Sequence, residues 1–125
     1  MKRDLDLMRE ILLRVEASDD LVFPPYLPSS SRPQAEIAYQ VIQLSEAGYI
    51  KASFTPMQGP PGEMGVIVRL THSGHEYLDG VRDPKVWERT KKELAKVPGG
   101  SGPLEFVKDF AARALVELYK SSSGP

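Results

Sequence analysis

No cysteine occurs among the 125 residues of the chain, so the sequence excludes disulfide bonds. This absence fits a reducing compartment. No apolar run approaches the roughly 20 residues that a membrane-spanning helix requires. The charged first residues also lack the apolar stretch of a secretory signal peptide. We therefore expect a cytoplasmic protein with no membrane partner.

An excess of charge of one sign is lacking as well. The chain holds 16 Lys and Arg against 17 Asp and Glu, and its formal net charge is -1. Nucleic-acid-binding proteins usually carry a basic surface. The overall composition does not indicate such a surface, so a basic patch on this protein has to be local.

The spacing of apolar residues predicts five helices and one β-hairpin. Apolar stripes with three- and four-residue spacing occur in the segments 4–17, 34–47, 72–78, 84–97 and 103–120. Strict alternation predicts paired strands over 49–55 and 65–71. Residues 21–33 contain four prolines and three serines, which exclude a long helix there. Trp87 should be largely buried and hold the 84–97 helix in place.

The order of these elements is that of a winged helix. We predict an α+β fold: a winged helix-turn-helix-like domain with a β-hairpin wing and additional C-terminal helices. Residues 1–80 would form the winged-helix core, and 81–120 a helical extension packed on it. Residues 121–125 would form a disordered tail.

Three stretches carry a resemblance to a known family: MKRDLDLMREILLRVE at the start, LSEAGYI at the end of the second helix, and RLTHSGHEYLDGVRDPKVW. They resemble the small prophage-associated winged-helix family catalogued as domain of unknown function 2513, over about residues 1–95. The resemblance implies a winged-helix fold and a phage or prophage context, and it implies little about activity.

The 34–47 helix would be the recognition helix of such a fold. Its outward side chains include glutamines, which can read adenine through paired hydrogen bonds, while nearby cations would contact phosphates. The predicted nucleic-acid-binding residues are Arg32, Gln34, Tyr39, Gln40, Gln43, Lys51 and Arg69. The alternative is a solvated polar face, because the helix itself has no Lys or Arg.

A second candidate for phosphate contacts lies in the 84–97 helix. Four cations follow one side of it: Lys85, Arg89, Lys92 and Lys96. Two glutamates interleave with them, so this stripe is either a phosphate-binding face or a solvated helix surface.

Apolar residues in two places indicate a protein partner. The loop between the strands has no cation and is rich in Met and Pro, and the last helix has a wide apolar face. The predicted partner-binding residues are Met57, Pro60, Pro61, Met64, Phe110, Ala114 and Leu118. We expect a homodimer through the last helix. The alternatives are a disordered loop and a last helix that folds back on its own chain.

Motifs for chemistry are sparse. His72, His75 and Glu76 lie at helical spacing but lack the further ligands of a zinc site. The GGSG at 99–102 lacks the Lys and the preceding strand of a phosphate-binding loop. No catalytic triad or paired-acid pattern occurs, so we expect no enzyme, no cofactor and no metal.

The sequence therefore predicts a winged-helix DNA-binding or transcription-regulating protein of phage or mobile-element origin, with double-stranded DNA as its partner. The alternative is a protein–protein interaction module, such as a phage factor that binds and modulates a host protein. Neither the operator, the partner nor the host is encoded in a recognisable motif.

Overall fold

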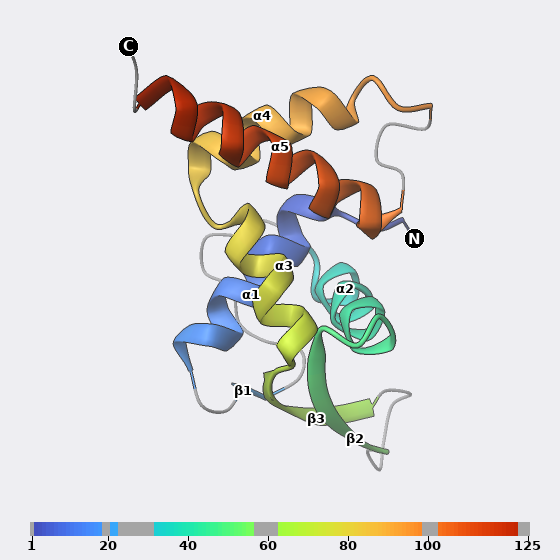
Figure 1. Ribbon diagram of the computed structural model, residues 1–125. Coiled ribbons are helices and arrows are strands. Elements are labelled where there is room, and N and C mark those ends of the chain that lie inside the picture. The colour runs from blue at the N-terminus through green and yellow to red at the C-terminus, as the bar shows by residue number, and fades with distance from the viewer. Residues whose placement is uncertain (1, 19–20, 23–31, 57–62, 99–102, 123–125) are drawn as a thin grey trace. The chain divides into compact units, whose positions relative to one another are not determined.

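The computed structural model describes residues 2–18, 21–22, 32–56, 63–98 and 103–122 (Figure 1). The chain divides into two compact units, Met1–His75 and Glu76–Pro125. This boundary falls within a helix, five residues before the end of the core that the sequence predicts.

Two helices of the first unit supply its core. α1 spans Leu5–Ala17 and begins at Asp4, whose carboxylate accepts a hydrogen bond from the backbone N–H of Leu7 at 3.0 Å. α2 spans Gln34–Glu46 and is followed by Gly48, which has a φ of 82° and ends the helix in a left-handed turn. The buried apolar side chains of the two helices are Leu7, Met8, Ile11, Leu12, Val15, Ile37, Val41 and Leu44.

A small antiparallel sheet completes this unit. Its strands are β1 (Leu21–Val22), β2 (Ile50–Pro56) and β3 (Glu63–Leu70), in the order β1-β3-β2. β2 pairs with β3 from Ile50 opposite Leu70 to Pro56 opposite Glu63, with an irregularity after Lys51. The predicted pairing of the two longer strands is confirmed.

The start of α3 (His72–Val81) is locked to the turn before the sheet. The Thr71 hydroxyl donates a hydrogen bond to the backbone carbonyl of Gly48 and accepts one from the N–H of Gly74 at 3.0 Å. A Cβ atom at Gly74 would lie 1.9 Å from the carbonyl oxygen of Tyr49. Only glycine therefore allows this close approach of α3 to the strand entry.

The second unit contains the end of α3 and the helices α4 (Pro84–Leu94) and α5 (Leu104–Ser122), which lie side by side (Figure 1). Asp83 caps α4 by accepting hydrogen bonds from two backbone N–H groups. Trp87 is only 3% exposed, which confirms its predicted burial. The buried face of α5 consists of Val107, Ala111 and Ala114.

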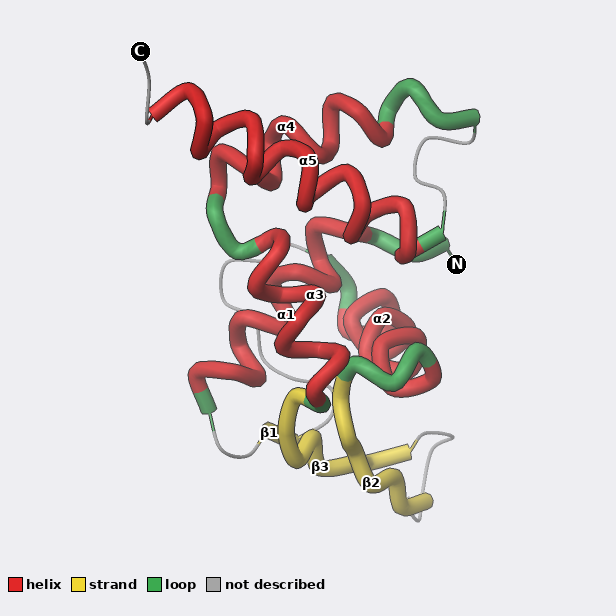
Figure 2. Tube along the Cα trace, in the orientation of Figure 1, coloured by secondary structure: helices red, strands yellow, loops and turns green. Residues whose placement is uncertain are grey.

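The predicted fold class was wrong. Within the described ranges the chain forms five helices and one sheet whose strands have two, seven and eight residues, so the fold is mostly helical (Figure 2). The order of elements suggested an α+β winged helix, but helices of 10 to 19 residues outweigh the small sheet. α5 also extends to Ser122, beyond the start of the predicted tail.

Candidate functional site

Gln40, expected on the outward face of the recognition helix, is buried. Only 2% of it is exposed. Its side-chain oxygen accepts a hydrogen bond from the backbone N–H of Asp4 at 3.0 Å, and its amide nitrogen donates to the carbonyl oxygen of Lys2 at 2.9 Å. Gln40 therefore anchors the chain before α1 to α2 and is not available to a base edge.

Arg32 is engaged in the same corner of the molecule. Its guanidinium lies 2.7 Å from the Asp4 carboxylate and 3.4 Å from that of Glu36. The other oxygen of Asp4 caps α1. Arg32 and Gln40 thus hold the start of α1 against α2, and a phosphate would have to compete with two carboxylates for Arg32.

The other predicted DNA-contacting residues differ in exposure. Gln34, Lys51 and Arg69 are exposed, whereas Tyr39 and Gln43 are half-buried. Lys51 and Arg69 lie directly opposite each other in the hairpin. Like charges in that position are unfavourable unless an anion or solvent separates them. The hairpin therefore offers two adjacent cations, without further Lys or Arg on α2.

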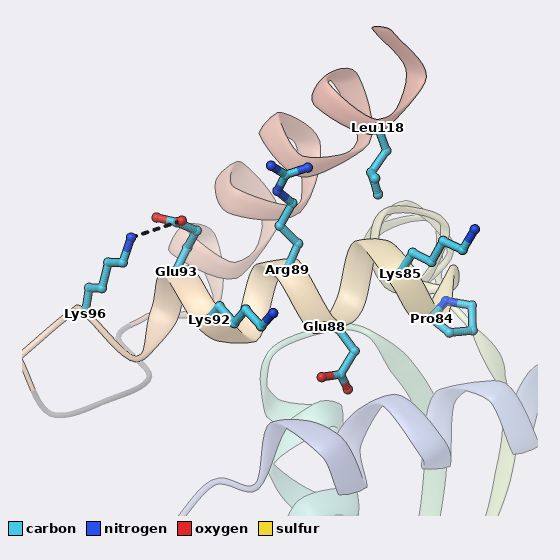
Figure 3. A pocket seen from close by; sticks show the side chains of 8 residues that line it. All are labelled: Pro84, Lys85, Glu88, Arg89, Lys92, Glu93, Lys96 and Leu118. Carbon is cyan, nitrogen blue, oxygen red and sulfur yellow. Dashed lines mark hydrogen bonds and ion pairs between the residues drawn. The ribbon is translucent and has the colours of Figure 1, made fainter. Parts of the chain in front are cut away.

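The predicted basic stripe of α4 lines an open hollow of about 800 Å³ (Figure 3). Its wall consists of Pro84, Lys85, Glu88, Arg89, Lys92, Glu93, Lys96 and, from α5, Leu118. We call this surface the α4 groove. Arg89 points toward α5, whereas Glu88 points to the other side of α4 (Figure 3). Four cations and two carboxylates give the α4 groove a positive charge.

The ion pairs of the α4 groove leave two of its cations available. Arg89 lies 3.2 Å from Glu117 of α5, and Lys96 lies 3.3 Å from Glu93. Lys85 and Lys92 have no ion-pair partner among the residues that the structure describes.

Glu88 is neutralised from outside the four-cation stripe. The ammonium group of Lys91 lies 3.1 Å from its carboxylate and 5.9 Å from the centroid of the Trp87 ring. Lys91 thereby reduces the repulsion that Glu88 would exert on an anion in the α4 groove.

The outer face of α5 exposes large apolar side chains. Leu115, Val116 and Tyr119 are 49%, 52% and 72% exposed, and Phe106 is 43% exposed. The sequence includes Leu115 in the wide apolar face of this helix and does not single out Val116 or Tyr119. Their positions become recognisable only once α4 is known to cover the opposite face of the helix.

The residues predicted for partner binding lie in different environments. Ala114, predicted to face a partner, is buried against its own chain. Phe110 is half-buried, 6.2 Å from the ring of Phe106, and Leu118 lines the α4 groove. Met57, Pro60 and Pro61 lie outside the described residues. Met64 belongs to β3, where it pairs with Thr55.

His72, His75 and Glu76 are exposed at the start of α3. In the part of the chain that the structure describes, no three metal-ligating side chains come together. A helix long and apolar enough to cross a membrane is absent from the same residues.

Comparisons with known proteins identify the family. No solved structure matches the chain. An "Uncharacterized protein" of Haemophilus influenzae (strain ATCC 51907 / DSM 11121 / KW20 / Rd) is 35% identical over 98 residues, which cover 75% of this chain and 79% of the relative. Residues 2–101, which include α4 but not α5, match the family described as "Hypothetical protein (DUF2513)". The chain therefore belongs to the DUF2513 family.

Proposed function

We propose that this protein binds double-stranded DNA, as a DNA-binding or transcription-regulating factor of a phage or other mobile element, and that the α4 groove contacts the phosphate backbone. The observation that carries this proposal is the alignment of four cations along one open groove, two of which have no ion-pair partner among the described residues.

The spacing of the cations suits a phosphate backbone. Lys85, Arg89 and Lys92 span seven positions of α4, about 10 Å along the helix, and Lys96 lies two residues beyond its end at Leu94. A DNA strand rises about 3.4 Å per phosphate while it turns around the duplex axis, so a straight helix of this length reaches about two or three neighbouring phosphates of one strand. Lys85 and Lys92, which have no ion-pair partner in the part of the chain that the structure describes, are spaced to contact two of them.

α2 is less suited to this role. Its charged residues are Glu36 and Glu46, which repel phosphates, and its central glutamine is buried. Backbone contacts position a protein on DNA without reading bases. The proposal is therefore of electrostatic binding with modest sequence preference, in which α4 is the main contact.

A second candidate function rests on a different surface. The exposed apolar side chains of α5 are typical of a protein-interaction site. A module that binds a host or phage protein through this face would need no basic groove. The two functions therefore make opposite predictions for the α4 cations.

Fluorescence anisotropy with a labelled DNA duplex tests the proposal. The wild-type protein should bind with an affinity that falls steeply with salt. Replacing Lys85→Gln and Lys92→Gln together should lower the salt slope by about two, one for each lost phosphate contact.

A control variant with the same change in net charge is Lys2→Gln with Arg14→Gln. Both side chains are exposed and lie on or before α1. This variant should keep the wild-type slope. No duplex binding at low salt, or an equal loss in both variants, would contradict the proposal.

A further inference from the structure

The outer face of α5 has the composition of a self-complementary helix interface. Leu115 and Tyr119 are four residues apart, and Val116 and Tyr119 are three apart, so the three side chains are neighbours on one helix surface. Ala112 is exposed and lies one turn before Leu115 and Val116. From these residues we infer that two copies of the chain associate through antiparallel pairing of their α5 helices.

The surface around Ala112 is recessed on both sides. One open hollow of about 380 Å³ is lined by Glu76, Tyr77, Asp79, Gly80, Lys108, Ala112 and Leu115. Another of about 390 Å³ is lined by Ala112, Arg113, Val116, Glu117 and Lys120. A two-fold interface uses the same patch on both copies, so it needs a projection and a recess within one patch. Tyr119 is the projection, and the surface at Ala112 is the recess.

The pairing is specified by residue positions along α5. When the two-fold axis passes between residues 115 and 116, Leu115 of one copy faces Val116 of the other. Tyr119 of one copy then lies over Ala112 of the other. Large residues therefore face small ones without a change in the helix backbone.

Charge selects the antiparallel orientation. Asp109 and Lys120 are exposed on the same flank of α5, eleven positions apart. In the antiparallel pair, Asp109 of each copy approaches Lys120 of the other, which forms two equivalent ion pairs. A parallel pair in register would instead place each charge beside its own counterpart. The antiparallel arrangement also aligns the two helix dipoles favourably.

This dimer leaves the α4 groove open. Leu118, through which α5 contributes to the α4 groove, lies on the flank of α5 away from Val116 and Tyr119. Each dimer would therefore carry two α4 grooves and bind one duplex at two places. That consequence rests on the proposed function, whereas the dimer itself does not.

A charge exchange on the full chain tests the inference. Sedimentation equilibrium over a range of micromolar concentrations should show a monomer–dimer equilibrium for the wild type. Asp109→Lys should raise the dimer dissociation constant on the order of tenfold, because two ion pairs become repulsive contacts. Asp109→Lys combined with Lys120→Asp should restore dimerisation, and circular dichroism should show unchanged helix content in both variants.

The outcomes separate this inference from the proposed function. A monomeric wild type, or a dimer that is insensitive to Asp109→Lys, would overturn the inference. A dimer that follows the charge exchange supports it, even when no DNA binds. Failure of DNA binding by such a dimer would overturn the proposed function alone.

Discussion

Gly74→Ala is expected to destabilise the protein strongly, and the size of the loss in the free energy of unfolding follows from the local geometry. The added Cβ would lie 1.9 Å from the backbone carbonyl oxygen of Tyr49, and that oxygen also accepts a hydrogen bond from the N–H of Thr71 at 3.0 Å. A backbone atom cannot rotate away as a side chain can, so α3 and the start of β2 have to move apart. Overpacking of a tight contact typically costs about 1–3 kcal/mol, and this clash belongs at the upper end.

The same substitution at Gly80 is the matched control. It lies in the same helix, and its added Cβ would meet the Cβ of Ala111 at 3.9 Å, an ordinary contact. Alanine has a higher helix propensity than glycine by about 1 kcal/mol. Gly80→Ala should therefore be neutral or stabilising, while Gly74→Ala destabilises.

Thermal unfolding followed by circular dichroism measures both variants. A loss of about 3 kcal/mol corresponds to a melting temperature lower by roughly 10 °C in a chain of this size. Two results would refute the reasoning: a Gly74→Ala variant that melts within about a degree of the parent, or a Gly80→Ala variant that is destabilised equally.

Three further predictions concern the core, the corner at Gln40 and the hairpin cations. Trp87→Ala should lower the free energy of unfolding in urea by about 3–5 kcal/mol, because it leaves a cavity at a buried site. A decrease of less than about 1 kcal/mol would show that the side chain is peripheral. Gln40→Ala should lower the free energy of unfolding by about 1–3 kcal/mol, because the backbone groups of Asp4 and Lys2 lose their hydrogen-bond partner. An unchanged urea midpoint would contradict the anchoring role of Gln40. Lys51→Gln with Arg69→Gln should leave the salt slope of duplex binding unchanged, whereas a decrease of about two would assign the contact to the hairpin.

Local patterns in the sequence predicted most of the individual elements. The alternation in β2 and β3 and the apolar stripe of α1 depend on neighbouring residues, and these elements begin and end within two residues of the expected positions. The Asp83-Pro84 start of α4 is equally local, because the cap bonds reach only two and three residues along the chain.

Features that depend on distant partners could not be predicted in this way. Gln40 bonds to groups 36 and 38 positions away, so helical spacing alone suggests an outward glutamine. The prediction of the fold class was wrong for a related reason, because the order of elements along the chain does not determine how they pack. On α5, both flanks of the buried stripe are apolar, and only the covering of Val107, Ala111 and Ala114 distinguishes the inner face from the exposed one.

A nuclear magnetic resonance titration tests the central claim most directly. Isotope-labelled full-length protein would be titrated with an unlabelled DNA duplex at low salt, and changes in the amide and lysine side-chain signals would be assigned by residue. The changes should concentrate at Lys85, Arg89, Lys92 and Lys96 and disappear at high salt. Changes that concentrate on α2 and the hairpin, or a spectrum that the duplex leaves unaltered, would contradict the assignment of the α4 groove as the DNA-binding surface.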